Sequence, residues 1–183
     1  MNENDYRYLM DLSLRRQREY VAVETDYDLY WLEGDKHEVV YTLQGIRGSV
    51  ILEHFHTHIL DEKDFNEQFL TYNCEIMKYP SMIDFYTYNH LSNKLKDKIQ
   101  SFSVGTWCPI DSMVTITKFN SLDIVKNFSE IRDVRRKLST LDKMMKNRVI
   151  TPLETAIQSV ALTENLARTI GFQIRTFYLD FTP

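Results

Sequence analysis

The sequence predicts a single α+β domain over residues 1–183, in which a mostly antiparallel sheet packs against helices. Two patterns predict this class. Apolar and polar residues alternate over residues 26–60, as in β-strands, and apolar residues recur every three or four positions over residues 121–170, as in helices. A chain of 183 residues with 43% hydrophobic content is also large and apolar enough to bury one core.

The N-terminal part predicts a helix followed by a three-stranded meander. Apolar side chains share one side over residues 5–20, which indicates an amphipathic helix. Alternating runs follow at 26–32, 37–44 and 49–60. The turns between these runs are short and contain glycine, so we expect three strands that pair with their neighbours in antiparallel order.

Mixed elements are expected in the middle of the chain. Asp61 is a suitable N-cap for a helix over 62–78. The next expected elements are a strand near 82–88, a short basic helix near 90–100 and a strand at 112–118.

The C-terminal third predicts a long helical hairpin and a final strand. Apolar residues at helical spacing indicate one helix over 121–147. A capping box that begins at Thr151, with proline at the first helical position, opens a second helix, and Gly171 is placed to end it. Residues 172–181 then alternate again and predict the last strand.

Composition disfavours several classes of protein. The chain has only 5 glycines, and it contains no GxGxxG, Walker-type or nucleophile-elbow motif. These absences disfavour dinucleotide oxidoreductases, P-loop enzymes and α/β-hydrolases. No apolar run reaches the ~18 residues of a membrane span, and the polar N-terminus does not resemble a secretory signal.

The net charge of −4 argues against a general nucleic-acid binder. Two short basic clusters are expected to be solvated helix faces: Arg15, Arg16 and Arg18, and Arg135, Arg136 and Lys137. The only two cysteines, Cys74 and Cys108, lie far apart and form no CxxC motif. We expect free thiols in a reducing cytoplasm, although the sequence leaves a single disulfide open.

Three histidines alternate in the segment LEHFHTHIL. On a strand this period places His54, His56 and His58 on one face, about 7 Å apart per step. Imidazoles beside acids such as Glu62 and Asp64 are typical zinc ligands, so these residues are candidates for a metal site. The alternative is a histidine-rich sheet surface that binds no metal and is used for packing or contact.

The segment resembles the HxH…D arrangement of JAMM/MPN-type zinc peptidases. In this resemblance His56 and His58 form the pair, Asp64 is the later acid and Glu38 is the upstream glutamate. It covers fewer than ~30 residues, lacks the proline after the pair and lacks the Ser-x-x-Asp spacing, because Asp64 comes too early. The residues from Gly48 to His56 also resemble the start of a cupin motif, without its later glycine or its second motif.

The leading interpretation is a non-enzymatic protein–protein interaction or assembly protein. It is motivated by the missing catalytic motifs, by 11 Tyr and 10 Phe, and by long helices with wide apolar faces. The composition also suits an AT-rich genome, which indicates a bacteriophage protein of the virion neck or tail, or an inhibitor of a host enzyme. We then expect it in the host cytoplasm or the virion.

Other protein subunits are the expected partners, with no membrane and no required cofactor. The residues predicted to contact them are Trp31, Tyr86, Tyr88, Arg135, Arg136 and Met144. The alternative function is a zinc-dependent hydrolase that uses His54, His56 and His58, with Asp64 or Glu62 as ligand or general base.

Overall fold

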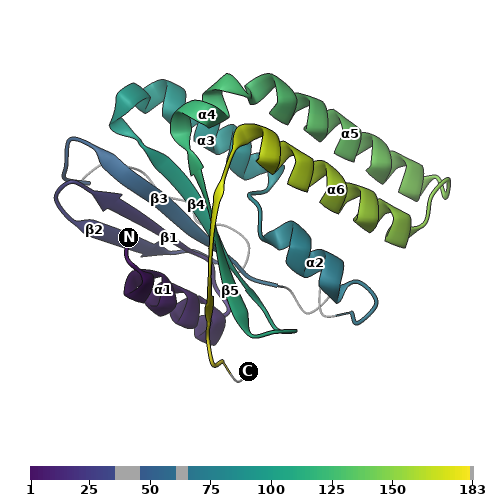
Figure 1. The fold of residues 1–183 in the computed structure, drawn as a ribbon, viewed down its shortest axis with the longest axis horizontal. Coiled ribbons are helices and arrows are strands. Elements are labelled where there is room, and N and C mark those ends of the chain that lie inside the picture. The colour runs from purple at the N-terminus through teal and green to yellow at the C-terminus, as the bar shows by residue number, and fades with distance from the viewer. Residues whose placement is uncertain (36–45, 61–65, 182–183) are drawn as a thin grey trace.

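The computed structural model describes residues 1–35, 46–60 and 66–181. Its centre is a six-stranded sheet with the strand order β2-β1-β3-β4-β5-β6 (Figure 1). The strands are β1 (Tyr20–Thr25), β2 (Leu29–Glu33), β3 (Ile51–His58), β4 (Ser101–Cys108), β5 (Met113–Asn120) and β6 (Gln173–Tyr178). Every neighbouring pair is antiparallel except β3 and β4, which are parallel.

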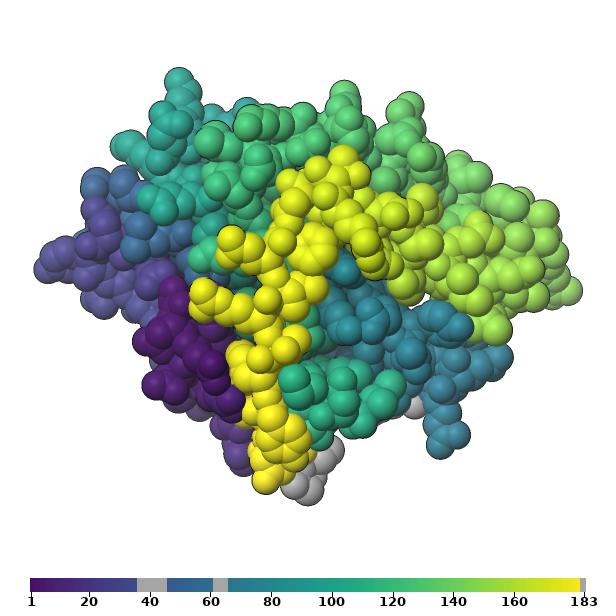
Figure 2. Space-filling model, in the orientation of Figure 1, coloured from purple at the N-terminus to yellow at the C-terminus, as the bar shows by residue number. Residues whose placement is uncertain are grey.

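Helices cover both faces of this sheet. They are α1 (Glu3–Arg16), α2 (Leu70–Met77), α3 (Met82–Leu95), the short 3-10 helix η2 (Lys96–Lys98), α4 (Ser121–Lys126), α5 (Phe128–Lys146) and α6 (Pro152–Ile170). Helix α1 lies on one face, and the helices α3 to α6 pack over the other (Figure 1). The α5–α6 hairpin extends to one side of the sheet (Figure 1) and forms the green lobe at the right of the space-filling view (Figure 2).

The two faces of the sheet hold separate hydrophobic cores. On the α1 side, Met10 packs against Phe55 and neighbouring strand residues. On the other side, Phe85 of α3 packs against Phe102 and Phe119. Gly105 on β4 allows α1 to approach closely, because a Cβ there would lie 2.7 Å from the Phe55 ring and 2.8 Å from the Met10 sulfur.

The predicted α+β class is confirmed, and so are the N-terminal helix, the C-terminal helical hairpin and the final strand. The capping box at Thr151 forms as expected, since the Thr151 hydroxyl accepts a hydrogen bond from the Glu154 N–H and the Glu154 carboxylate accepts one from Thr151 N–H. The first helix of the hairpin is divided in two, because α4 ends at Lys126 and α5 begins at Phe128, with Asn127 between them.

The predicted meander is wrong in its pairing. Strand β1, which the sequence analysis missed, lies between β2 and β3 and pairs with both. The expected strand at 37–44 lies outside the described residues. The sequence analysis also missed β4, whose side chains are all buried, although Phe102 and Val104 alternate with Ser101 and Ser103 at its start.

The predicted strand at 82–88 is wrong, because these residues begin helix α3. The segment MIDFYTY is rich in aromatic residues and resembles a strand locally. In the helix, Phe85, Tyr88 and Ser92 are the buried positions, and their spacing of three and four is helical. The helix expected at 62–78 is described as α2 from Leu70, and 61–65 lie outside the described residues.

None of the helices in the described ranges combines the length and the apolar character that a membrane-spanning segment requires.

Candidate metal centre

Three potential metal ligands converge where β3 ends and α3 begins. The Nε2 atoms of His56 and His58 are 2.9 Å apart. An oxygen of Asp84 lies 3.5 Å from the Nε2 atom of His56 and 3.4 Å from the Nε2 atom of His58. The two histidines are nearly buried, whereas the Asp84 side chain is 25% exposed, so the group lies just below the surface.

The strand period positions the two imidazoles. Side chains two residues apart on β3 point to the same face, which is the face covered by α3. His54 lies on this face as predicted, but its ring packs against Tyr88 and Phe102, and it is not a member of the converging group. Burial, with the neighbouring His56, lowers the pKa of His54 to about 3, which keeps this side chain neutral.

Helix capping positions the carboxylate. The crossover from β3 to the parallel strand β4 contains α2 and α3. Ser81 is the N-cap of α3, and its hydroxyl accepts a hydrogen bond from the Asp84 N–H at 3.2 Å. In return, the Asp84 carboxylate accepts a hydrogen bond from Ser81 N–H at 2.7 Å. This reciprocal capping box holds the Asp84 carboxylate toward the two imidazoles.

The second nitrogen of each imidazole also has a partner. The hydroxyl of Tyr88 lies 2.7 Å from His56 Nδ1. His58 Nδ1 lies 3.2 Å from the Met77 carbonyl oxygen, so it carries the proton and donates it, because a carbonyl only accepts. In the neutral imidazole, His58 Nε2 is then left with a lone pair that points into the group. Such outer hydrogen bonds fix the tautomer and the orientation of metal-binding histidines.

The charges of the group depend on one another. Burial raises the pKa of Asp84, but the two imidazoles outweigh it and hold the pKa of this carboxyl well below its ordinary value. Burial lowers the pKa of His58, but Asp84 and then Glu19 raise it above its ordinary value. Burial also lowers the pKa of His56, and this effect prevails over Asp84. The group thus combines an ionised carboxylate with at least one neutral imidazole at neutral pH.

The spacing of the three ligand atoms suits a zinc ion. Ligands about 2.05 Å from a tetrahedral ion lie about 3.3 Å from one another. The two nitrogen–oxygen distances of 3.5 and 3.4 Å match this value, and the nitrogen–nitrogen distance of 2.9 Å is slightly shorter. Two imidazoles and one carboxylate are a donor set typical of catalytic zinc, which keeps its fourth position for water or substrate. Within the described ranges, no fourth His, Cys, Asp or Glu joins the group.

Glu19 is a further acid beside the group. The antiparallel register places Val21 opposite His56, so two residues further along Glu19 lies next to His58. Its backbone is fixed by hydrogen bonds to Gly34 and Asp35. The side chain is half-buried, and its charge contributes to the raised pKa of His58. The sequence analysis did not identify this glutamate.

The structure brings together two of the three predicted histidines with an acid that the sequence analysis did not select. The predicted acids Glu38, Glu62 and Asp64 all lie outside the described residues. Asp84 is the acid that meets the histidine pair, and it lies three residues after Ser81, the N-cap of α3. The capping-box pattern after Pro80 is the signal that could have revealed it, but the aromatic residues that follow predict a strand near 82–88.

The residues predicted to contact partners lie in different environments. Trp31 is 46% exposed, and its ring packs against Tyr8 and Tyr20. Tyr88 is buried beside His56, so its predicted role at a surface is wrong. The other four lie on α3 and α5: Tyr86, Arg135, Arg136 and the half-buried Met144.

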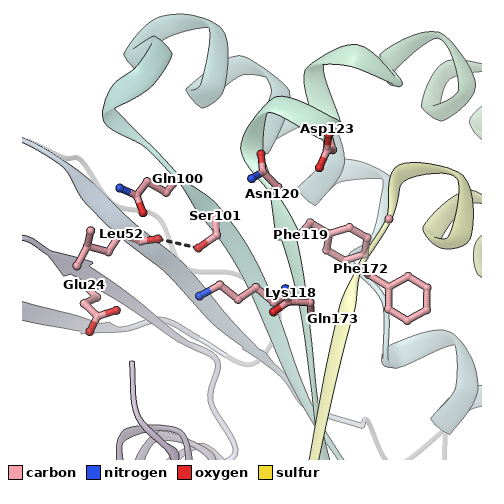
Figure 3. Close-up of a pocket in the computed structure, with 11 residues that line it drawn as sticks. Glu24, Leu52, Gln100, Ser101, Lys118, Phe119, Asn120, Asp123, Phe172 and Gln173 are labelled. Atoms are coloured by element: carbon pink, nitrogen blue, oxygen red, sulfur yellow. Dashed lines mark hydrogen bonds between the residues drawn. The ribbon is translucent and has the colours of Figure 1, made fainter.

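A separate hollow of about 530 Å³ lies over the sheet near Glu24, Gln100 and Lys118 (Figure 3). Its charged side chains are already engaged. The Lys118 ammonium lies 2.8 Å from Glu53, and Glu24 contacts the amino group of Met1. No residue that lines this hollow belongs to the group of His56, His58 and Asp84.

Comparisons with protein-family models, with curated proteins and with solved structures found no match. The function must therefore be argued from the geometry of the site. The phage origin, the location and the protein partners expected from the composition stay predictions.

Proposed function

We propose that this protein is a zinc-dependent hydrolase whose metal ligands are His56, His58 and Asp84. The convergence of the three ligand atoms carries this proposal. Each is held by its own contact: His56 by Tyr88, His58 by the Met77 carbonyl and Asp84 by its capping box. Side chains that met by chance would not need this many orienting contacts.

A bound zinc ion supplies Lewis acidity and a water that ionises near neutral pH. The protein contributes the orientation of the ligands and a nearby base. Glu19 is the candidate general base, because its carboxylate lies beside His58 without belonging to the ligand group. In this role it accepts a proton from water and returns it to the leaving group. The 25% exposure of Asp84 leaves a side from which a substrate can approach.

The resemblance to JAMM/MPN-type zinc peptidases supports peptide bonds as the substrate class. The HxH pair is followed by a Ser-x-x-Asp sequence, with the acid at Asp84 instead of Asp64. The order along the chain and the ligand types therefore agree with the resemblance. The proline after the pair is still missing, since Ile59 and Leu60 occupy that place.

Elemental analysis of the purified protein tests the metal. We expect one zinc per chain, and its loss in the His56→Ala/His58→Ala variant. The exposed residue His90 provides the matched control, because His90→Ala removes an imidazole that lies outside the group. Substoichiometric metal in the wild-type protein, or stoichiometric iron, which also binds two histidines and one carboxylate, would overturn the zinc proposal.

Cleavage of a quenched fluorescent peptide library tests the reaction. We expect activity that a chelator abolishes and that added zinc restores. Glu19→Gln should retain zinc and lose about 100-fold in rate, within the range for removal of a general base. Equal rates for Glu19→Gln and the wild-type protein would exclude Glu19 as the base.

A second candidate function, contact with an acidic protein partner, is supported by a basic groove of about 760 Å³ on α5. Its lining residues are Tyr86, Ser129, Arg132, Arg135, Arg136, Ser139, Thr140 and Lys143. Arg136 pairs with Asp133, but Arg132, Arg135 and Lys143 have no carboxylate within 4.0 Å among the described residues. Arg135 also stacks on the Tyr86 ring at 4.6 Å, which orients its guanidinium and covers the ring.

The other basic cluster serves as the control for this groove. Arg15 pairs with Asp11, and Arg16 and Arg18 pair with Glu33. We expect a labelled poly-glutamate peptide to bind in a salt-dependent way, and to bind about tenfold more weakly to Arg132→Glu/Arg135→Glu. Arg15→Glu should bind like the wild-type protein. Stronger binding of an oligonucleotide would contradict a protein partner, because it would indicate phosphate recognition.

A further inference from the structure

The two cysteines, distant in sequence, meet in the fold. Cys74 lies on α2 and Cys108 is the last residue of β4, and both are buried. Their sulfur atoms are 2.6 Å apart. A disulfide bond is about 2.05 Å long, so the two sulfurs are within reach of a covalent bond.

This pair adjoins the contacts that orient His58. Cys74 is one helical turn before Met77, whose carbonyl accepts the hydrogen bond from His58 Nδ1. Cys108 is two residues after Thr106, whose hydroxyl donates to the same carbonyl at 2.7 Å. Met77 also packs in the small apolar cluster that contains both cysteines. The cysteine pair therefore joins the two elements that meet at the Met77 carbonyl.

Helix α2 depends on such contacts for its position. It has only 8 residues, and its N-cap residue Phe69 makes no side-chain capping bond. A helix of this length is not stable alone, so tertiary contacts must hold it in place. A covalent link to β4 would restrain α2 more firmly than packing alone.

We propose that Cys74 and Cys108 form a reversible disulfide that clamps α2 to β4 and strengthens metal binding at the His58 site. The effect on the metal rests on the proposed zinc site, whereas formation of the disulfide does not. The oxidised protein holds the Met77 carbonyl in place, and with it the Nδ1–H tautomer of His58. Reduction leaves α2 held by packing alone, which restrains this ligand less firmly.

The oxidant is a small disulfide such as oxidised glutathione. One cysteine thiolate attacks a glutathione sulfur, which breaks the glutathione disulfide and releases one glutathione thiolate. The second cysteine thiolate then attacks the protein sulfur of the mixed disulfide and releases the other. The two protein thiols are oxidised, the glutathione disulfide is reduced, and the two protons lost by the protein thiols pass through water to the two glutathione thiolates, which become thiols.

Burial makes this exchange slow. Burial, with the adjacent Cys108 sulfur, raises the pKa of the Cys74 thiol, so little thiolate forms while α2 is packed. The reaction needs a transient opening of α2, which its short length favours.

The first measurement is the state of the cysteines in the intact protein. After incubation with oxidised glutathione and removal of the reagent, we expect no free thiol under denaturing conditions and a monomer mass lower by two hydrogen atoms. A reducing agent should restore both thiols. Cys74→Ser and Cys108→Ser should each form no link within the chain. Persistence of both free thiols, or links only between chains, would overturn the inference.

The second measurement is metal affinity, by competition with a chromophoric zinc chelator. We expect oxidised wild-type protein to bind zinc about tenfold more tightly than reduced protein, the lower end of the effect of outer-shell contacts. Cys74→Ala, with its fold checked by circular dichroism, should have the weaker affinity in both conditions. The His56→Ala/His58→Ala variant measures any zinc held by the thiols themselves.

The two proposals fail in different ways. If the disulfide forms and oxidised and reduced wild-type proteins bind zinc equally well, the clamp is refuted and the zinc site stands. If neither form binds zinc, the proposed function fails, and with it the effect of the clamp, while the mass and the thiol count still decide whether the disulfide forms.

Discussion

Strand β3 carries a buried polar cluster on each of its faces, and the two clusters differ in how their charges are satisfied. On the α1 face, Glu53 is fully buried and accepts hydrogen bonds from Tyr6, Ser103 and Lys118. On the other face, His56 and His58 direct two Nε2 atoms toward each other and toward Asp84.

The Glu53 cluster is complete within the chain, since its carboxylate meets an ammonium group and two hydroxyl donors. The histidine cluster has its outer nitrogens engaged by Tyr88 and Met77, and its two inner Nε2 atoms face each other and the Asp84 carboxylate. A buried charge is therefore not by itself a sign of function. What distinguishes the histidine cluster is that three potential ligand atoms converge and are oriented by contacts outside the group.

The largest difference between the two clusters is expected in metal binding. Asp84→Ala removes one of three ligands and should weaken zinc binding more than about 100-fold, beyond the effect of outer-shell changes. Glu53→Gln should leave the zinc affinity unchanged, because its carboxylate points to the opposite face. Isothermal titration with zinc measures both variants. Similar losses in the two would break the distinction between them.

The free energy of unfolding should show the reverse order, with the larger loss in Glu53→Gln. Glu53→Gln removes a buried carboxylate that accepts hydrogen bonds from Lys118 and two hydroxyls, and it should lower the free energy of unfolding by about 2 kcal/mol at neutral pH. Asp84→Ala should cost less in the metal-free protein, because this carboxylate is partly exposed. Urea denaturation measures both values.

The Glu53 effect should also depend on pH. Burial raises the pKa of Glu53, but the hydrogen bonds from Lys118, Ser103 and Tyr6 outweigh this effect. The pKa of Glu53 in the folded protein therefore lies below its ordinary value of 4.5. The stabilisation by Glu53 is therefore complete above pH 4.5, and it is lost as the pH falls through the pKa that Glu53 has in the folded protein. The difference between the wild-type protein and Glu53→Gln should shrink in acid. A difference that grows in acid would contradict this assignment.

A smaller effect is expected at the outer contact of His56. Tyr88→Phe keeps the ring stacked on Phe102 and removes only the hydroxyl beside His56 Nδ1. We expect about tenfold weaker zinc binding and a loss of about 1 kcal/mol in stability. Tyr86→Phe is the matched control on the same helix, and it should not change the zinc affinity. Equal affinities in all three proteins would show that His56 needs no orienting partner.

The smallest effect is expected at Ser81, and it distinguishes the contribution of this residue to helix capping from its contribution to metal binding. Ser81→Ala and Thr151→Ala each remove a capping-box hydroxyl and should each cost about 1 kcal/mol in thermal denaturation. Only Ser81→Ala should also weaken zinc binding, by less than about tenfold, because its capping box holds Asp84. Equal effects of both variants on zinc affinity would indicate general destabilisation instead.

The sequence by itself determined the features that depend on local period and capping. Alternation on residues 51–58 was enough to place His54, His56 and His58 on one face, and helical spacing with the capping box at Thr151 was enough to predict the C-terminal hairpin. These features follow from contacts between residues that are near in the chain, so a single sequence reveals them.

Only the tertiary structure decided which acid completes the histidine pair and which partners surround it. Asp84 is 26 residues after His58, and Glu19 reaches the site through the pairing of β1 with β3. The meeting of Cys74 with Cys108 likewise depends on the packing of α2 against β4. Local pattern could not predict these contacts, because they form only when burial of the apolar faces brings distant segments together.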